Sequence, residues 1–193
     1  PASATAPPRA QLVERYAREI HDLRLAIHET YTQASARALR AYVTTEEPHI
    51  QTRLSARFGN YLELLGYSMP AAALRTFGSQ AINRFEMSYY FRVHEPVPPG
   101  YELRVVMRGE RESKTMDHVP VRGLYALSDL KPGEYIDDQH RLVLPDRWSS
   151  PTVTPCLMLV DARGVPVPAI RPDEKAAACV PIATLTVHKR PGK

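Results

Sequence analysis

The stretch Met87-Ser-Tyr-Tyr-Phe-Arg-Val93 separates two hydrophobic patterns in this chain of 193 residues. Before it, apolar residues recur at the spacing of an α-helix, and from Met87 onward they alternate with polar residues, as in a β-strand. Thirteen of the eighteen prolines also follow Met87. Because proline is poorly tolerated inside helices, we predict a helical first half and a β second half.

The first half predicts three helices. Apolar residues between Leu12 and Val43 recur about every 3.6 residues, which predicts one long amphipathic helix. A helical hairpin is expected to follow, with one helix from His49 to Leu65 and another from Ser68 to Phe85. Residues 12–86 therefore form the predicted helical region, and an extended Pro- and Ala-rich arm precedes it at residues 1–11.

Residues 87–193 are predicted to form an antiparallel β region. Strands at Met87–Val93 and Tyr101–Met107 are expected to pair as a hairpin across Pro96–Gly100. Further strands are expected at Val119–Leu127, Glu134–Ile136, Arg141–Leu144, Leu157–Val160, Val165–Ile170 and Val180–His188. Short strands interrupted by prolines favour a small antiparallel β-barrel or sandwich. The predicted fold class is therefore α+β, a three-helix region followed by this β unit, with both packed as one compact body.

Composition narrows the class of protein. No apolar run approaches the roughly 20 residues that a membrane span needs, so a soluble chain is expected. The net charge of +4 is mild and forms no basic tail. Cys156 and Cys179 are expected to be two buried thiols, with a disulfide as the alternative, which would indicate an oxidising compartment. The Ala-, Ser- and Arg-rich start slightly favours a mitochondrial location after presequence cleavage, and a virion or an extracytoplasmic location are the alternatives.

Few residues suggest chemistry. Asp137, Asp138 and His140 are close in sequence and could hold a metal ion or exchange protons, but a solvated link between strands is the preferred interpretation. His21 and His28 do not form the HExxH pattern of a zinc hydrolase. The sequence contains no nucleophile elbow and no phosphate-binding loop. We therefore predict no catalytic, metal-binding or cofactor-binding residue, and we expect that the protein is not an enzyme.

Two short stretches resemble pieces of known families. Leu159-Val-Asp-Ala-Arg-Gly164-Val is similar to the central hairpin of extracytoplasmic PAS-like sensor domains, which also begin with a long helix. That resemblance implies a ligand pocket in the β layer and a helix that transmits a signal to a membrane. The segment Ala126–Ile136 resembles part of the SAF-type β-clip domain. Each stretch covers about a dozen residues around a turn, and neither assigns the chain to a family.

Taken together, these features favour a non-enzymatic structural or accessory subunit of a larger multi-protein assembly. Its expected partners are other protein subunits, and its expected docking elements are the N-terminal arm and the long helix. The predicted interface residues are Pro7, Pro8, Arg9, Arg15, Arg18, Tyr90 and Arg92. The alternative is a PAS-like ligand-binding sensor domain. A further alternative is an RNA-binding subunit of a ribonucleoprotein, which is not favoured because the chain lacks a basic stripe.

Overall fold

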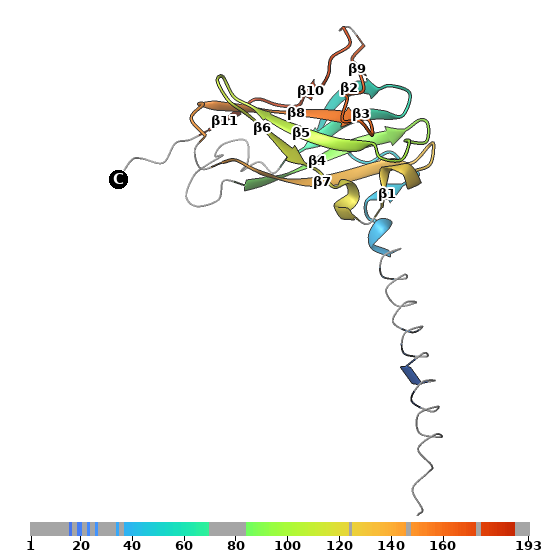
Figure 1. Cartoon of the computed structure of the whole chain (residues 1–193). Coiled ribbons are helices and arrows are strands. Elements are labelled where there is room, and N and C mark those ends of the chain that lie inside the picture. Colours follow the sequence, from blue (N-terminus) through green and yellow to red (C-terminus); the bar gives the residue numbers. More distant parts are fainter. Residues whose placement is uncertain are drawn as a thin grey trace, which may run out of the picture. The chain divides into compact units, whose positions relative to one another are not determined.

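The computed structural model divides into two compact units, Pro1–Ala38 and Leu39–Lys193 (Figure 1). The residues that it describes are 37–69, 84–123, 125–145, 148–172 and 175–187, together with Tyr16, Glu19, Ile20, Leu23, Ala26 and Ala34. In the first unit, all of the described residues are α-helical. None of the helices in the described part of the chain is long and apolar enough to cross a membrane.

The second unit consists of two antiparallel sheets (Figure 1). The six-stranded sheet has, in spatial order, β1 (Val43–Thr44), β7 (Tyr135–Val143), β4 (Arg84–Val93), β3 (Leu62–Ser68), β2 (Thr52–Phe58) and β9 (Ala169–Ile170). The five-stranded sheet has β10 (Val180–Pro181), β8 (Thr152–Val160), β5 (Glu102–Arg108) and β6 (Ser113–Asp117), with β11 (Leu185–Thr186) also paired to β8. Two short 3-10 turns, η2 (Pro120–Gly123) and η3 (Leu127–Asp129), precede β7.

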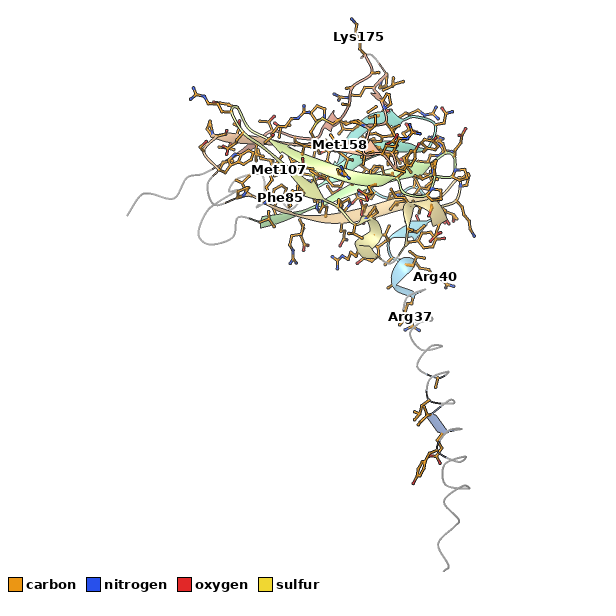
Figure 2. All side chains as sticks on the ribbon, in the orientation of Figure 1. Arg37, Arg40, Phe85, Met107, Met158 and Lys175 are labelled. Atoms are coloured by element: carbon orange, nitrogen blue, oxygen red, sulfur yellow. A yellow bond between two sulfur atoms is a disulfide. The ribbon has the colours of Figure 1, made fainter. Side chains whose placement is uncertain are left out.

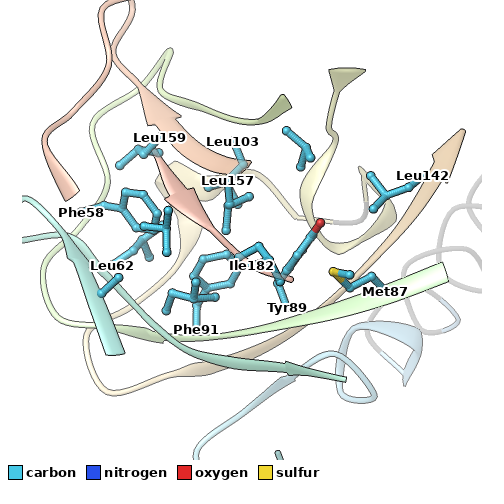
Figure 3. Close-up of a cluster of buried hydrophobic side chains, with 14 of the residues drawn as sticks. Phe58, Leu62, Met87, Tyr89, Phe91, Leu103, Leu142, Leu157, Leu159 and Ile182 are labelled. Atoms are coloured by element: carbon cyan, nitrogen blue, oxygen red, sulfur yellow. The ribbon is translucent and has the colours of Figure 1, made fainter. Parts of the chain in front are cut away.

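One hydrophobic core joins the two sheets. Every second residue of β4 is buried, from Phe85 to Val93, because successive side chains of a strand point to opposite faces. These side chains belong to the same buried cluster as Met107 of β5 and Leu157 of β8 (Figures 2 and 3). The architecture is therefore a β-sandwich, in which large side chains from both sheets share the interior.

The prediction of a three-helix N-terminal region is wrong, and the clearest error is the helix expected at His49–Leu65. Strands β2 and β3 occupy this segment and pair as an antiparallel hairpin. The hairpin turns at Gly59, which has a φ of 53°. The large apolar residues Leu54, Phe58 and Leu62 are four residues apart, a spacing that keeps side chains on one face of a strand and also on one face of a helix, and this produced an apparent helical spacing.

The helix expected at Ser68–Phe85 meets strands at both ends. Ser68 is the last residue of β3, and Phe85 lies in β4. The intervening residues 70–83 lie outside the described part of the chain. The first predicted helix, from Leu12 to Val43, also differs at its end, because Val43 belongs to β1.

The hairpin predicted between Met87–Val93 and Tyr101–Met107 is also wrong. Strand β4 pairs with β3 and β7, whereas β5 pairs with β6 and β8 in the other sheet. The proline-rich link between β4 and β5 therefore carries the chain from one sheet to the other. The chain also changes sheets after β8. It forms a single bridge back to β8, between Val160 and Pro166, and then pairs with β2 of the other sheet through β9. Residues Val119–Leu127, expected as a strand, include η2 instead.

A disulfide bond joins Cys156 on β8 to Cys179, next to β10. Both cysteines are buried, and no free cysteine is found among the described residues. The disulfide closes a loop of 23 residues in sequence separation. It corrects the preferred expectation of two buried thiols, and it fastens the C-terminal segment to the five-stranded sheet.

Candidate functional site

The alternation of strand β7 places two polar residues inside the sandwich. Asp138 and His140 are buried at the same face as Ile136 and Leu142, whereas Asp137, which precedes Asp138, is only half-buried. The three groups that the sequence placed together as a candidate site are therefore divided between two faces of the strand. Only Asp138 and His140 belong to the interior.

Asp138 is held by two hydrogen bonds from the segment that precedes β7. The Nε2–H group of His118 donates to Oδ2 of Asp138 at 2.5 Å. The backbone N–H of Val121 donates to Oδ1 at 2.8 Å. The side chains of His118 and Asp138 are 2% and 0% exposed. Because an unpaired buried carboxylate would be very costly, these two bonds are what allow Asp138 to lie in the core.

The turn that contains Val121 has strained backbone geometry. Val121 and Arg122 have φ values of 51° and 53°, and Gly123 follows with 75°. A side chain with a Cβ atom in this left-handed region costs roughly 1–2 kcal/mol. The Val121 N–H bond to Asp138 offsets part of this cost, as does a 2.6 Å bond from Nη2 of Arg122 to Oε1 of Gln139. Strand β7 therefore maintains a turn that the local sequence disfavours.

A second imidazole completes the buried cluster. The ring of His140 stacks on that of His118, with centroids 4.0 Å apart, and the Tyr89 ring lies 6.3 Å from each. Within the described residues, the hydroxyl of Tyr89 and Nδ1 of His140 have no hydrogen-bond partner. Burial, together with the neighbouring His118, lowers the pKa of His140 to about 3. His140 is therefore uncharged at neutral pH and gives Asp138 no ionic partner.

Burial has the opposite effect on the acidic neighbours of the cluster. It raises the pKa of the Tyr89 phenol well above its ordinary range, and the charge of Asp138 adds to this increase. Burial also raises the pKa of Asp137, against a hydrogen bond from Ser88 and with help from Asp138. Tyr89 thus stays protonated in the core, and the negative charge of the cluster is carried by Asp138.

A groove of about 630 Å³ lies beside this cluster. His118 and Val119 line it together with Tyr101, Tyr125 and Leu127. Among the described residues that line the groove there is no serine, threonine or cysteine that could act as a nucleophile. An imidazole oriented by a carboxylate can transfer protons, but here the carboxylate-bound edge of the ring is enclosed in the protein. The arrangement is best suited to holding the turn in place.

The residues predicted as an interface have different positions in the structure. Pro7, Pro8, Arg9, Arg15 and Arg18 lie outside the described residues. Tyr90 is only 7% exposed, and Arg92 is exposed, with its guanidinium 5.8 Å from the centre of the Tyr135 ring. All three aromatic rings of residues 89–91 are buried, so none is available for stacking on a nucleic-acid base. Contacts of these residues with a partner stay predictions.

Sequence reasoning missed His118 as a site residue, and no local signal identifies it. It is 20 residues from Asp138 in sequence, and the two meet because the segment between β6 and η2 packs against β7. Another described histidine, His94, lies outside this cluster, and its Nε2 is 2.8 Å from a carboxylate oxygen of Glu63. His21, His28 and His188 lie outside the described residues. Across the described part of the chain, no three His, Cys, Asp or Glu side chains are placed to hold a metal ion.

A different kind of feature occurs on the helical first unit. Tyr16, Ile20 and Leu23 are 56%, 52% and 61% exposed. Steps of four and three residues place them on one side of a helix. They form a row of large apolar side chains in contact with solvent, which we call the helix face.

No known protein family, curated protein or solved structure shows significant similarity to this chain.

Proposed function

We propose that this chain is a non-enzymatic accessory subunit of a larger multi-protein assembly. In this proposal the β-sandwich is a rigid body and the helical unit is the docking element. The observation that carries the proposal is the helix face, where Tyr16, Ile20 and Leu23 are each more than half exposed.

The arrangement of these side chains matters more than their number. Single apolar residues are common on protein surfaces, but a continuous apolar row is typical of a surface that binds a partner. Full burial of side chains of this size is worth roughly 1.5–3 kcal/mol each. Burying all three against a partner would therefore supply a substantial part of the free energy of binding, even after the loss of motional freedom.

The β-sandwich supports a structural role for the second unit. Its buried carboxylate is fixed by groups of the same unit: Asp138 accepts hydrogen bonds from His118 and from the Val121 backbone. The Cys156–Cys179 disulfide further restrains the C-terminal segment. Disulfides persist in oxidising compartments and are rare in reducing ones, so the proposal places the assembly in an oxidising compartment.

Co-purification from the source cells tests the proposal. An Ile20→Asp chain is compared with an Ile170→Asp chain, because both isoleucines are 52% exposed and only Ile20 belongs to the helix face. We expect Ile20→Asp to lose its co-purifying subunits and Ile170→Asp to keep them. If both variants keep the same subunits as the unchanged chain, the docking role of the helix face is overturned.

Ligand sensing is a second candidate function, and the groove beside His118 favours it. Its volume of about 630 Å³ falls in the usual range for small-molecule sites, roughly 300–1,000 Å³. A Val119→Arg substitution would obstruct the groove from a position that is 65% exposed, where a fold defect is not expected. If a metabolite screen raises the melting temperature of the unchanged chain but not of the variant, sensing is supported. The absence of any stabilising compound would leave the accessory-subunit proposal as the better one.

A further inference from the structure

The helix face continues in the sequence with the spacing of a coiled coil. Apolar residues alternate in steps of three and four through Val13, Tyr16, Ile20, Leu23 and Ile27. In a heptad written abcdefg, Val13, Ile20 and Ile27 take position a, and Tyr16 and Leu23 take position d. Two heptads of a and d positions are therefore filled by large apolar side chains.

The choice of residues at these positions is specific. β-Branched residues at a, combined with leucine at d, favour two parallel helices over higher oligomers. All three a positions from Val13 to Ile27 are β-branched, and one of the two d positions is Leu23. A helix with this pattern can pack against an identical helix, so a second copy of the chain can bury the a and d residues of the first.

Residues of opposite charge flank the apolar row at positions that face each other in a parallel pair of helices. Glu19 takes position g and Arg24 takes position e of the following heptad. In a parallel pair of helices, a g residue of one helix lies near the e residue of the next heptad on the other helix. Glu19 of one copy would thus approach Arg24 of the second copy, and the reverse contact would form by symmetry. Opposite charges at these positions favour the parallel pairing of identical chains.

We propose that the helix face is the seam of a parallel two-stranded coiled coil formed with a second copy of this chain. The inference rests on the proposed function, because it assigns a partner to the same docking face. The described residues of the seam, Tyr16, Ile20 and Leu23, are helical and exposed, as an unpaired seam would be. Because two heptads are short, the dimer is expected to be concentration-dependent.

Site-specific crosslinking of the full chain tests this pairing. The sequence has only two cysteines, and they are bonded to each other, so an introduced cysteine is the single free thiol. Tyr16→Cys places this thiol at position d, where identical residues of two parallel helices meet. Asp22→Cys places it at position c, away from the seam, and serves as the control. An antiparallel pair would not bring two copies of residue 16 together.

Under mild oxidation at micromolar concentration, we expect Tyr16→Cys to yield covalent dimer at least ten times more readily than Asp22→Cys. Equal yields from the two variants would overturn the parallel pairing. Sedimentation of the chain without an introduced cysteine supplies a second measurement. This chain should be a dimer at high concentration, and its Ile20→Asp variant should be a monomer. A far-UV spectrum and an unchanged melting temperature confirm that the sandwich of each variant is folded.

The two proposals can fail separately. If Tyr16→Cys does not crosslink and yet Ile20→Asp loses its co-purifying subunits, the second-copy inference is overturned and the accessory role stands. If Tyr16→Cys crosslinks and Ile20→Asp sediments as a monomer but still enters the assembly, the coiled coil stands. In that case the docking role that we assign to the helix face is overturned.

Discussion

Asp138 binds His118 with one carboxylate oxygen, at 2.5 Å from Nε2, and the backbone N–H of Val121 with the other, at 2.8 Å. This single side chain on β7 thereby fixes both a buried imidazole and a strained turn. Because both contacts lie in the core, the geometry of the turn depends on the integrity of the pair. The strain at Val121 and Arg122 is maintained from the neighbouring strand.

Replacing Asp138 should therefore lower the free energy of unfolding, and the adjacent Asp137 provides the control. Asp138→Asn removes the charge that His118 binds, and we expect a loss of about 3 kcal/mol in the free energy of unfolding. Asp137→Asn should change it by less than about 0.5 kcal/mol, because Asp137 is half-buried and its pKa is already raised. Chemical denaturation of both variants measures the difference. Equal losses would mean that the His118 pair does not fix the turn.

Acid should destabilise the sandwich through His140. Its pKa is about 3 in the folded chain, below the ordinary value of 6.5, so the unfolded chain binds this proton first as the pH falls. The stability that depends on His140 is complete above about pH 6.5 and is lost progressively toward pH 3, by on the order of 1 kcal/mol per pH unit.

The test compares the unchanged chain with His140→Phe between pH 7 and pH 4. Phenylalanine preserves a ring beside His118 and removes the titrating group. The variant should lose less stability over this range, as measured by denaturant titration at each pH. Parallel pH profiles for the two chains would show that protonation of His140 does not oppose folding.

Gly66 should tolerate no side chain. A Cβ atom there would collide with the carbonyl oxygen of Thr52 and lie 2.6 Å from Cγ2 of Ile50. Gly66→Ala should therefore cost about 3 kcal/mol or more. Gly164, with a φ of 79° and no atom within 4 Å of an added Cβ, is the matched control. Gly164→Ala should cost only the backbone strain of roughly 1–2 kcal/mol, and thermal unfolding distinguishes the two.

The disulfide should contribute to stability in proportion to the loop that it closes. With a separation of 23 residues, breaking the Cys156–Cys179 bond is expected to cost about 3 kcal/mol. A Cys156→Ala, Cys179→Ala double variant should melt at a lower temperature than the oxidised chain. Reducing agent should lower the melting temperature of the unchanged chain and leave that of the double variant unaltered. A reductant effect on both chains would contradict this assignment.

The sequence predicted the strand over Met87–Val93 because one face of this central strand lies in the core and all of its residues, Met87, Tyr89, Phe91 and Val93, are apolar or aromatic and buried. The same reasoning failed at Thr52–Phe58 and Leu62–Ser68, because a step of four residues, as from Leu54 to Phe58, fits one face of a strand and one face of a helix equally well. A local signal was nevertheless present, because Gly59-Asn60 lies between these two strands and is a hairpin-turn pair.

The candidate site was harder to predict than the strands. Proximity in sequence brought Asp137, Asp138 and His140 to attention, but strand alternation separates Asp137 from the other two. His118 is distant in sequence, and only the packing of the segment between β6 and η2 against β7 brings it to Asp138. The disulfide was left open for the same reason, since cysteine spacing does not determine whether two strands are neighbours.

The most direct test of the accessory-subunit proposal is the native mass of the complex that carries this chain, isolated from its source cells at moderate salt. We predict one large species of fixed stoichiometry that contains other subunits, and we predict that the Ile20→Asp chain is absent from it. A free monomer, or a dimer of this chain with no other subunit, would contradict the proposal.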